Sequence, residues 1–106
     1  MDILEKKNRY NRLFDFYGDL LTDKQRTYFI NYYFEDLSLS EIAEIYSVSR
    51  NAVHDQLNKI YNLLDYYESK LGLCFKHDRY EEVLNEYQNS NNKEILELIN
   101  KLRSME

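Results

Sequence analysis

Proline is absent from this sequence of 106 residues, and glycine occurs only twice. A sheet of many strands needs such turn-forming residues at short intervals, so their scarcity argues against a β-rich fold. Tryptophan is also absent, and the single cysteine, Cys74, excludes a disulfide within the chain. Because Cys74 lies between Leu73 and Phe75, we expect a buried apolar thiol there, not a nucleophile or a metal ligand. The fold that these exclusions leave is a set of helices joined by short polar turns.

Long apolar runs are missing as well. No stretch of about 18 apolar residues occurs, and residues 1–7 lack the uninterrupted apolar region of a signal peptide. We therefore expect a cytoplasmic protein without membrane insertion. Hydrophobic residues nevertheless make up 43% of the chain, which is too much for a disordered protein. The length is typical of one domain, so we expect a single domain over residues 1–106.

Apolar residues recur at helical spacing along the chain. The first stripe ends at Gly18, which we expect in the left-handed conformation that closes many helices. Thr22 and Ser38 each stand three residues before a Gln or a Glu, which predicts capping boxes at the starts of a second and a third helix. Ser49 is the expected cap of a fourth helix, which runs to about Leu71.

Two further helices are expected near the C-terminus. Asp78 and Glu81 have the spacing of a capping box for a fifth helix, and Asn91 and Glu94 have it for a sixth. The predicted fold class is therefore all-α, with about six helices. Its parts are a helix-turn-helix core at about residues 20–71 and a C-terminal helical extension at about residues 78–105.

The fourth predicted helix carries a seam that resembles a coiled coil. Its apolar residues alternate spacings of four and three. They are Val53, Leu57, Ile60, Leu64, Tyr67 and Leu71. We expect this seam to pack against the first, fifth and sixth helices, with dimerisation through the same stripe as the alternative. The tyrosines at positions 32, 33, 66 and 67 are expected in the core, although exposed tyrosines could stack on single-stranded bases.

The short third helix, a tight turn and the long fourth helix have the layout of a helix-turn-helix without a wing. Ala43 is small where the two helices must approach closely, Val48 is placed to fill the turn, and Val53 is placed to anchor the fourth helix. Ser47 occupies a turn position where such motifs usually have glycine, and left-handed geometry costs a non-glycine residue about 1 kcal/mol. The turn is therefore expected to be adjusted here.

Polar residues at the start of the fourth helix lie opposite its apolar seam. In a helix-turn-helix this helix enters the major groove, and its N-terminal residues contact the bases. The candidate nucleic-acid-binding residues are Ser49, Arg50, Asn51, His54, Asn58 and Lys59, and Asp55 is expected on the same side of the helix. A solvated helix face has the same composition, so the pattern leaves both interpretations open.

The segments LTDKQR at 21–26, FEDLS at 34–38 and Ser49-Arg50 resemble region 4 of bacterial sigma factors over about half of the chain. With its N-terminal helix, long fourth helix and two C-terminal helices, the whole chain resembles the YlxM family of small proteins associated with the signal recognition particle. The resemblance implies a regulatory role in protein targeting. It also implies partners among the components of the particle, either the GTPase protein or its RNA. It does not imply a mechanism.

Net charge bears on the choice of partner. The chain has 14 basic and 19 acidic residues, whereas DNA-binding domains usually concentrate positive charge to release counterions from phosphates. This balance argues against strong, independent DNA binding. The acidic C-terminal helices are instead a candidate surface for docking on a basic protein by charge complementarity. The candidate protein-partner residues are Glu81, Glu82, Glu86, Glu94 and Glu97.

Three partners therefore stay open: the signal recognition particle, duplex DNA read by the helix at 50–71 of a dimeric transcriptional regulator, and RNA held by the helix-turn-helix face. An enzyme is not expected, because no nucleophile–base pattern, phosphate-binding glycine loop or dinucleotide fingerprint occurs. The two histidines, His54 and His77, are too few to predict a metal site, and no cofactor is expected.

Overall fold

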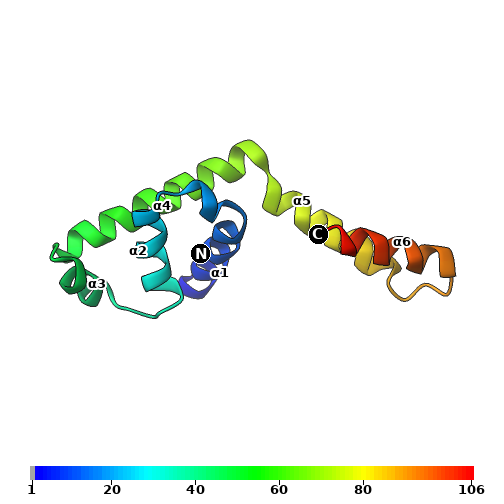
Figure 1. The fold of residues 1–106 in the computed structure, drawn as a ribbon, viewed down its shortest axis with the longest axis horizontal. Helices are drawn as coiled ribbons and strands as arrows, with labels where there is room; N and C mark the ends of the chain where they lie inside the picture. Colours follow the sequence, from blue (N-terminus) through cyan, green and yellow to red (C-terminus); the bar gives the residue numbers. More distant parts are fainter. Residues whose placement is uncertain (1) are drawn as a thin grey trace. The chain divides into compact units, whose positions relative to one another are not determined.

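The computed structural model describes residues 2–106 (Figure 1). In chain order its elements are α1 (Ile3–Tyr17), the 3-10 helix η1 (Gly18–Leu20), α2 (Asp23–Tyr33), α3 (Leu39–Tyr46), α4 (Arg50–Leu71), α5 (Leu73–Tyr87) and α6 (Lys93–Ser104). No strand occurs in the described residues, so the all-α prediction with about six helices is confirmed. The helices form two compact units, Met1–Gly72 and Leu73–Glu106. Among the described helices, none combines the length and apolar character that crossing a bilayer requires.

The apolar seam of α4 is the centre of the first unit. Val53, Leu57, Ile60 and Leu64 are buried where α4 packs against α1, α2 and α3. The seam therefore packs within the chain, as expected, but its partners were predicted only in part. The three helices that precede α4 cover it, whereas α5 and α6 belong to the second unit.

Stacked aromatic rings join α1, α2 and α4. The Phe29 ring lies between those of Phe14 and Tyr33, with centroids 4.2 Å away on each side. The Tyr33 hydroxyl donates a hydrogen bond of 2.9 Å to the Tyr61 hydroxyl. Of the four tyrosines predicted in the core, Tyr33 is buried and two are half-buried. The fourth, Tyr66, is 56% exposed, because it lies on the outward side of α4.

Side-chain caps fix the starts of α2 and α3, as predicted. Thr22 Oγ1 accepts a hydrogen bond of 3.1 Å from the Gln25 amide, and Gln25 Oε1 accepts one of 2.9 Å from the Thr22 amide. Ser38 and Glu41 form the same reciprocal pair, with both bonds at 3.1 Å. Each box satisfies two backbone donors that a helix start leaves without an intrahelical partner.

The predicted cap at Asp78 is wrong, because α5 begins five residues earlier, at Leu73. Gly72 adopts the left-handed conformation, with φ 62° and ψ 26°, and its amide donates to the Glu68 carbonyl. This one residue ends α4, and the chain is helical again directly after it. Asp78 therefore lies inside α5.

Two other helix ends differ from the prediction. Asn92, and not Asn91, caps α6, since Asn92 Oδ1 accepts from the Glu94 amide at 2.9 Å. Gly18 is right-handed, with φ −55°, and continues α1 into η1. A Cβ atom at Gly18 would lie 3.1 Å from the Phe14 ring, so close packing and not backbone conformation favours glycine there.

Candidate nucleic-acid interface

A left-handed serine shapes the turn between α3 and α4. Ser47 has φ 55° and ψ 45°, so it adopts the left-handed conformation itself and the expected adjustment of the turn is wrong. The Val48 amide donates to the Ala43 carbonyl oxygen at 3.0 Å. Ala43 and Val53 are buried where the two helices meet. Val48 is 39% exposed, so the prediction that it fills the turn is wrong. The backbone hydrogen bond closes the turn instead.

Ser49 caps the start of α4. Its Oγ atom accepts a hydrogen bond of 3.0 Å from the Ala52 amide, which confirms the predicted cap. The first backbone amides of a helix have no intrahelical partner and carry a partial positive charge. The cap therefore fixes the end of α4 that a helix-turn-helix directs toward its ligand.

Five of the six predicted contact residues are side chains of α4, and all five are exposed there. They alternate along α4 with the buried residues of the seam and therefore point outward. They are Arg50, Asn51, His54, Asn58 and Lys59. His54 Nδ1 lies 3.4 Å from Asn58 Nδ2 and 3.9 Å from the Asp55 carboxylate. We call these five residues, with Ser49, the α4 face.

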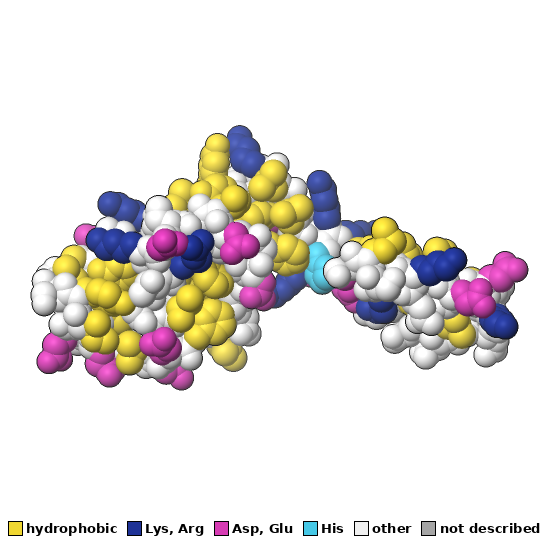
Figure 2. Space-filling view, viewed as in Figure 1, with side chains coloured by type: hydrophobic (Ala, Val, Ile, Leu, Met, Phe, Trp, Pro, Cys, Tyr) yellow, Lys and Arg dark blue, Asp and Glu magenta, His cyan; other side chains and the backbone are white. Residues whose placement is uncertain are grey.

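The two cations of the α4 face are available to a partner. Neither Arg50 nor Lys59 forms an ion pair or a side-chain hydrogen bond with any other residue in the described part of the chain. Acidic side chains lie near them in sequence: Asp55 is exposed on α4, and Glu41 and Glu44 are exposed on α3. On the face drawn in Figure 2, Lys and Arg are interspersed with Asp and Glu on the first unit. The α4 face therefore offers few positive charges to a nucleic acid.

Two of the five predicted docking glutamates are paired within their own unit. Glu81 Oε2 accepts from Arg103 at 3.2 Å, and Glu82 Oε2 accepts from Arg79 at 2.6 Å. The other three are exposed and form no ion pair with another residue of 2–106. They are Glu86, Glu94 and Glu97.

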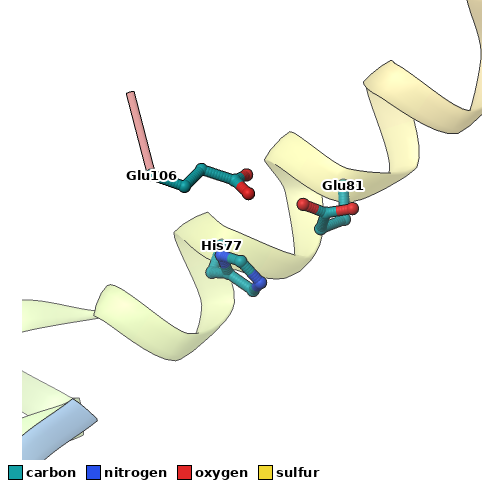
Figure 3. Close-up of side chains that lie close together, drawn as sticks. All are labelled: His77, Glu81 and Glu106. Carbon is teal, nitrogen blue, oxygen red and sulfur yellow. The ribbon is translucent and has the colours of Figure 1, made fainter. Parts of the chain in front are cut away.

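A cluster that the sequence analysis missed lies in the second unit (Figure 3). His77 and Glu81 are four residues apart on α5, and their possible ligand atoms lie within 4.8 Å of each other and of a Glu106 carboxylate oxygen. The hydrogen bond from Arg103 lowers the pKa of Glu81. These residues have the donor types of a metal site, but the Arg103 guanidinium already holds Glu81. The His-x-x-x-Glu spacing was a signal in the sequence, whereas Glu106 gave none.

Comparison with known proteins places this arrangement among helix-turn-helix proteins. Residues 4–103 match the model of the UPF0122 family, which is described as "Putative helix-turn-helix protein, YlxM / p13 like". The match spans the first unit and almost all of the second.

Individual relatives give the same result. The UPF0122 protein of Geobacillus kaustophilus is 50% identical over 82 residues, which cover 77% of this chain and 74% of the relative. The UPF0122 protein of Halalkalibacterium halodurans is 41% identical over 109 residues, with 98% of this chain and 100% of the relative covered. The relative in Listeria welshimeri is 45% identical, with 81% of this chain and 78% of the relative covered.

Proposed function

Because the chain belongs to the UPF0122 family of YlxM/p13-like helix-turn-helix proteins, we propose that it is a non-enzymatic regulatory protein of the signal recognition particle pathway. In this proposal the α4 face contacts the particle. The exposure of its five α4 side chains, with Arg50 and Lys59 unpaired within residues 2–106, is the observation that carries the proposal. The resemblance to proteins associated with the particle supplies the pathway.

The charge of the α4 face favours a partner that contains protein as well as nucleic acid. Two cations can neutralise about two phosphates, which predicts only about a tenfold loss of affinity between about 50 and 200 mM salt. Such a small electrostatic contribution supports weak binding to bare nucleic acid. A ribonucleoprotein adds contacts of other kinds, so it suits this mixed surface better.

The acidic second unit supports the same choice. Glu86, Glu94 and Glu97 are exposed carboxylates without an ion pair in the described residues. Proteins that bind RNA carry basic surfaces, and opposite charges across an interface speed association and select the partner. The proposed complex therefore uses the α4 face and this acidic unit on a single particle.

Fluorescence anisotropy of the labelled chain tests the proposal. The titrants are the assembled particle, its GTPase protein alone, its RNA alone and pooled duplex DNA, all at physiological salt. We expect saturable binding to the particle or one of its components. Saturable binding to duplex DNA alone would contradict the proposal.

Charge reversal identifies the surface that binds. We expect Arg50→Glu with Lys59→Glu to weaken binding to the particle by about tenfold or more, because each reversal removes a phosphate contact and puts a negative charge in its place. The control is Lys6→Glu with Lys24→Glu, which changes the net charge equally at exposed lysines of α1 and α2, outside both proposed contact surfaces. The control should bind like the unaltered chain.

A transcriptional regulator that reads duplex DNA is the second candidate function. The exposure of Arg50 and Asn51 at the start of α4 favours it, since Arg pairs with guanine and Asn with adenine in the major groove. In that case Asn51→Ala should abolish preference among DNA sequences. Reversal of Glu82 and Glu97 to lysine should leave DNA affinity intact or raise it, whereas it should weaken binding to a basic protein.

A further inference from the structure

The second unit, Leu73–Glu106, is a hairpin of two helices with a small interior. Helices α5 and α6 pack against each other, and of their residues only Cys74, Leu84 and Ile99 are buried. Units below about 40 residues usually depend on disulfides, metals or oligomerisation for stability. Cys74 is the single cysteine of the sequence, so no disulfide closes this hairpin. Covering more apolar surface would therefore stabilise it.

An apolar groove of about 220 Å³ runs between the two helices. Residues of both helices line it: Val83, Leu84, Tyr87, Ile95, Leu98 and Leu102, with Ile99 at its base. Val83 is 44% exposed, Tyr87 49% and Leu98 56%. Figure 2 shows hydrophobic atoms on the surface of this unit. A continuous exposed apolar surface of this kind marks an interaction site.

Charged residues are segregated along the groove. Arg79, Val83 and Glu86 follow each other on one face of α5 at spacings of four and three, and Glu94, Leu98 and Lys101 do the same on α6. The two helices are antiparallel, because a short turn joins them and they pack together (Figure 1). Arg79 and Lys101 therefore lie toward one end of the groove, and Glu86 and Glu94 lie toward the end that carries the turn.

We propose that the groove binds the same groove of a second copy of this chain, so that two antiparallel hairpins form a four-helix bundle. Two-fold symmetry requires a surface that complements itself. In the antiparallel pairing, the basic end of one groove meets the acidic end of the other. A parallel pairing would bring like charges together. The apolar residues of the four helices then form a shared core, as in other helix bundles.

This charge pattern favours a second copy over another protein as the occupant. The basic end and the acidic end of the groove complement each other in charge, so a second copy supplies a matching surface for both. The charged side chains are exposed and can turn toward that copy. Arg79 pairs with Glu82 in the isolated chain, but both side chains are more than 60% exposed, and such surface pairs contribute little. The inference is independent of which partner the α4 face binds. The dimer engages Glu86 and Glu94, so these two glutamates contact the second copy and not the particle while the chain is dimeric.

Sedimentation velocity of the full chain, from low to several hundred micromolar, tests the proposal. We expect a monomer–dimer equilibrium. Leu98→Glu should leave a monomer at every concentration while the helical circular dichroism stays unchanged, because Leu98 is exposed in the monomer. The matched control is Asn100→Glu, which adds the same charge on another face of α6 and should dimerise normally.

Charge exchange tests the antiparallel arrangement. Arg79→Glu with Lys101→Glu makes both ends of the groove acidic, and we expect the dimer dissociation constant to rise about tenfold or more. Adding Glu86→Lys and Glu94→Lys restores opposite ends and should restore the dimer. Either a monomer at all concentrations or a dimer that survives Leu98→Glu would overturn the proposal. If the variant with all four substitutions does not dimerise, the antiparallel pairing is overturned.

Discussion

Tyr10 of α1 is half-buried, and its hydroxyl donates a hydrogen bond of 2.7 Å to Asp65 of α4. Burial, and then this hydrogen bond, raise the pKa of Tyr10 to about 12. Because the folded state favours the neutral phenol, its contribution to stability is complete below the unfolded pKa of 10.0. That contribution is lost as the pH rises through about 12.

Replacement of Asp65 tests this linkage. We expect Asp65→Asn to lower the pKa of Tyr10 part of the way back toward 10.0, since burial remains when the carboxylate is gone. NMR titration of the Tyr10 ring measures the change. Asp55→Asn removes an exposed carboxylate of the same helix and serves as the control. An unchanged pKa in Asp65→Asn would show that the hydrogen bond has no such role.

Ser47 is the second residue with a consequence that can be measured. Its left-handed conformation is unfavourable for an L-residue, and glycine adopts it freely. We expect Ser47→Gly to raise the free energy of unfolding by about 0.5–1 kcal/mol in urea denaturation. Ser47→Val should lower it, because a branched side chain tolerates this conformation poorly. The opposite order of the two variants would contradict the turn geometry.

At the scale of helices, local sequence signals predicted most starts and faces correctly. Caps at Thr22, Ser38 and Ser49 stand where a polar residue precedes an apolar stripe, and the structure has all three. The Asp78 cap failed because the same spacing also occurs inside a helix. The left-handed Gly72 alone separates α4 from α5. The neighbouring residues in the sequence did not show that one residue is enough to end one helix and start the next.

The pair formed by Glu81 and Arg103 links α5 to α6 and makes the second unit sensitive to acid. Because the pKa of Glu81 is lowered from 4.5, its contribution to stability is present above 4.5 and is lost as the pH falls below that value. We expect Glu81→Gln to flatten the acid dependence of helix content, followed by circular dichroism. Glu97→Gln, at an exposed glutamate without an ion pair in residues 2–106, should keep the dependence.

At the scale of the whole molecule, the sequence predicted the fold class and the outward residues of α4, but not how the helices group. Periodicity shows which side of a helix is apolar and does not show which helix covers it. The seam of α4 was therefore assigned partly to helices that form the second unit. The groove of that unit was missed for the same reason, since its residues fit an ordinary core stripe.

Both units are acidic, which limits the partners that the whole chain can bind through charge. Residues 1–72 contain nine basic and twelve acidic side chains, and residues 73–106 contain five and seven. No unit therefore supplies the basic surface typical of a domain that binds nucleic acid without other contacts. Single-domain folding of residues 1–106 stays a prediction, which urea unfolding followed by separate probes of each unit would decide.

Site-specific photo-crosslinking in a mixture of the assembled signal recognition particle and duplex DNA distinguishes the two partners proposed for the α4 face. A photoreactive residue replaces Asn58 on the α4 face, and a second sample carries it at Asn8, an exposed position on α1. We expect crosslinks from position 58 to the particle, and few from position 8. Crosslinks from position 58 to the DNA, with none to the particle, would contradict the proposed function and assign the α4 face to transcription.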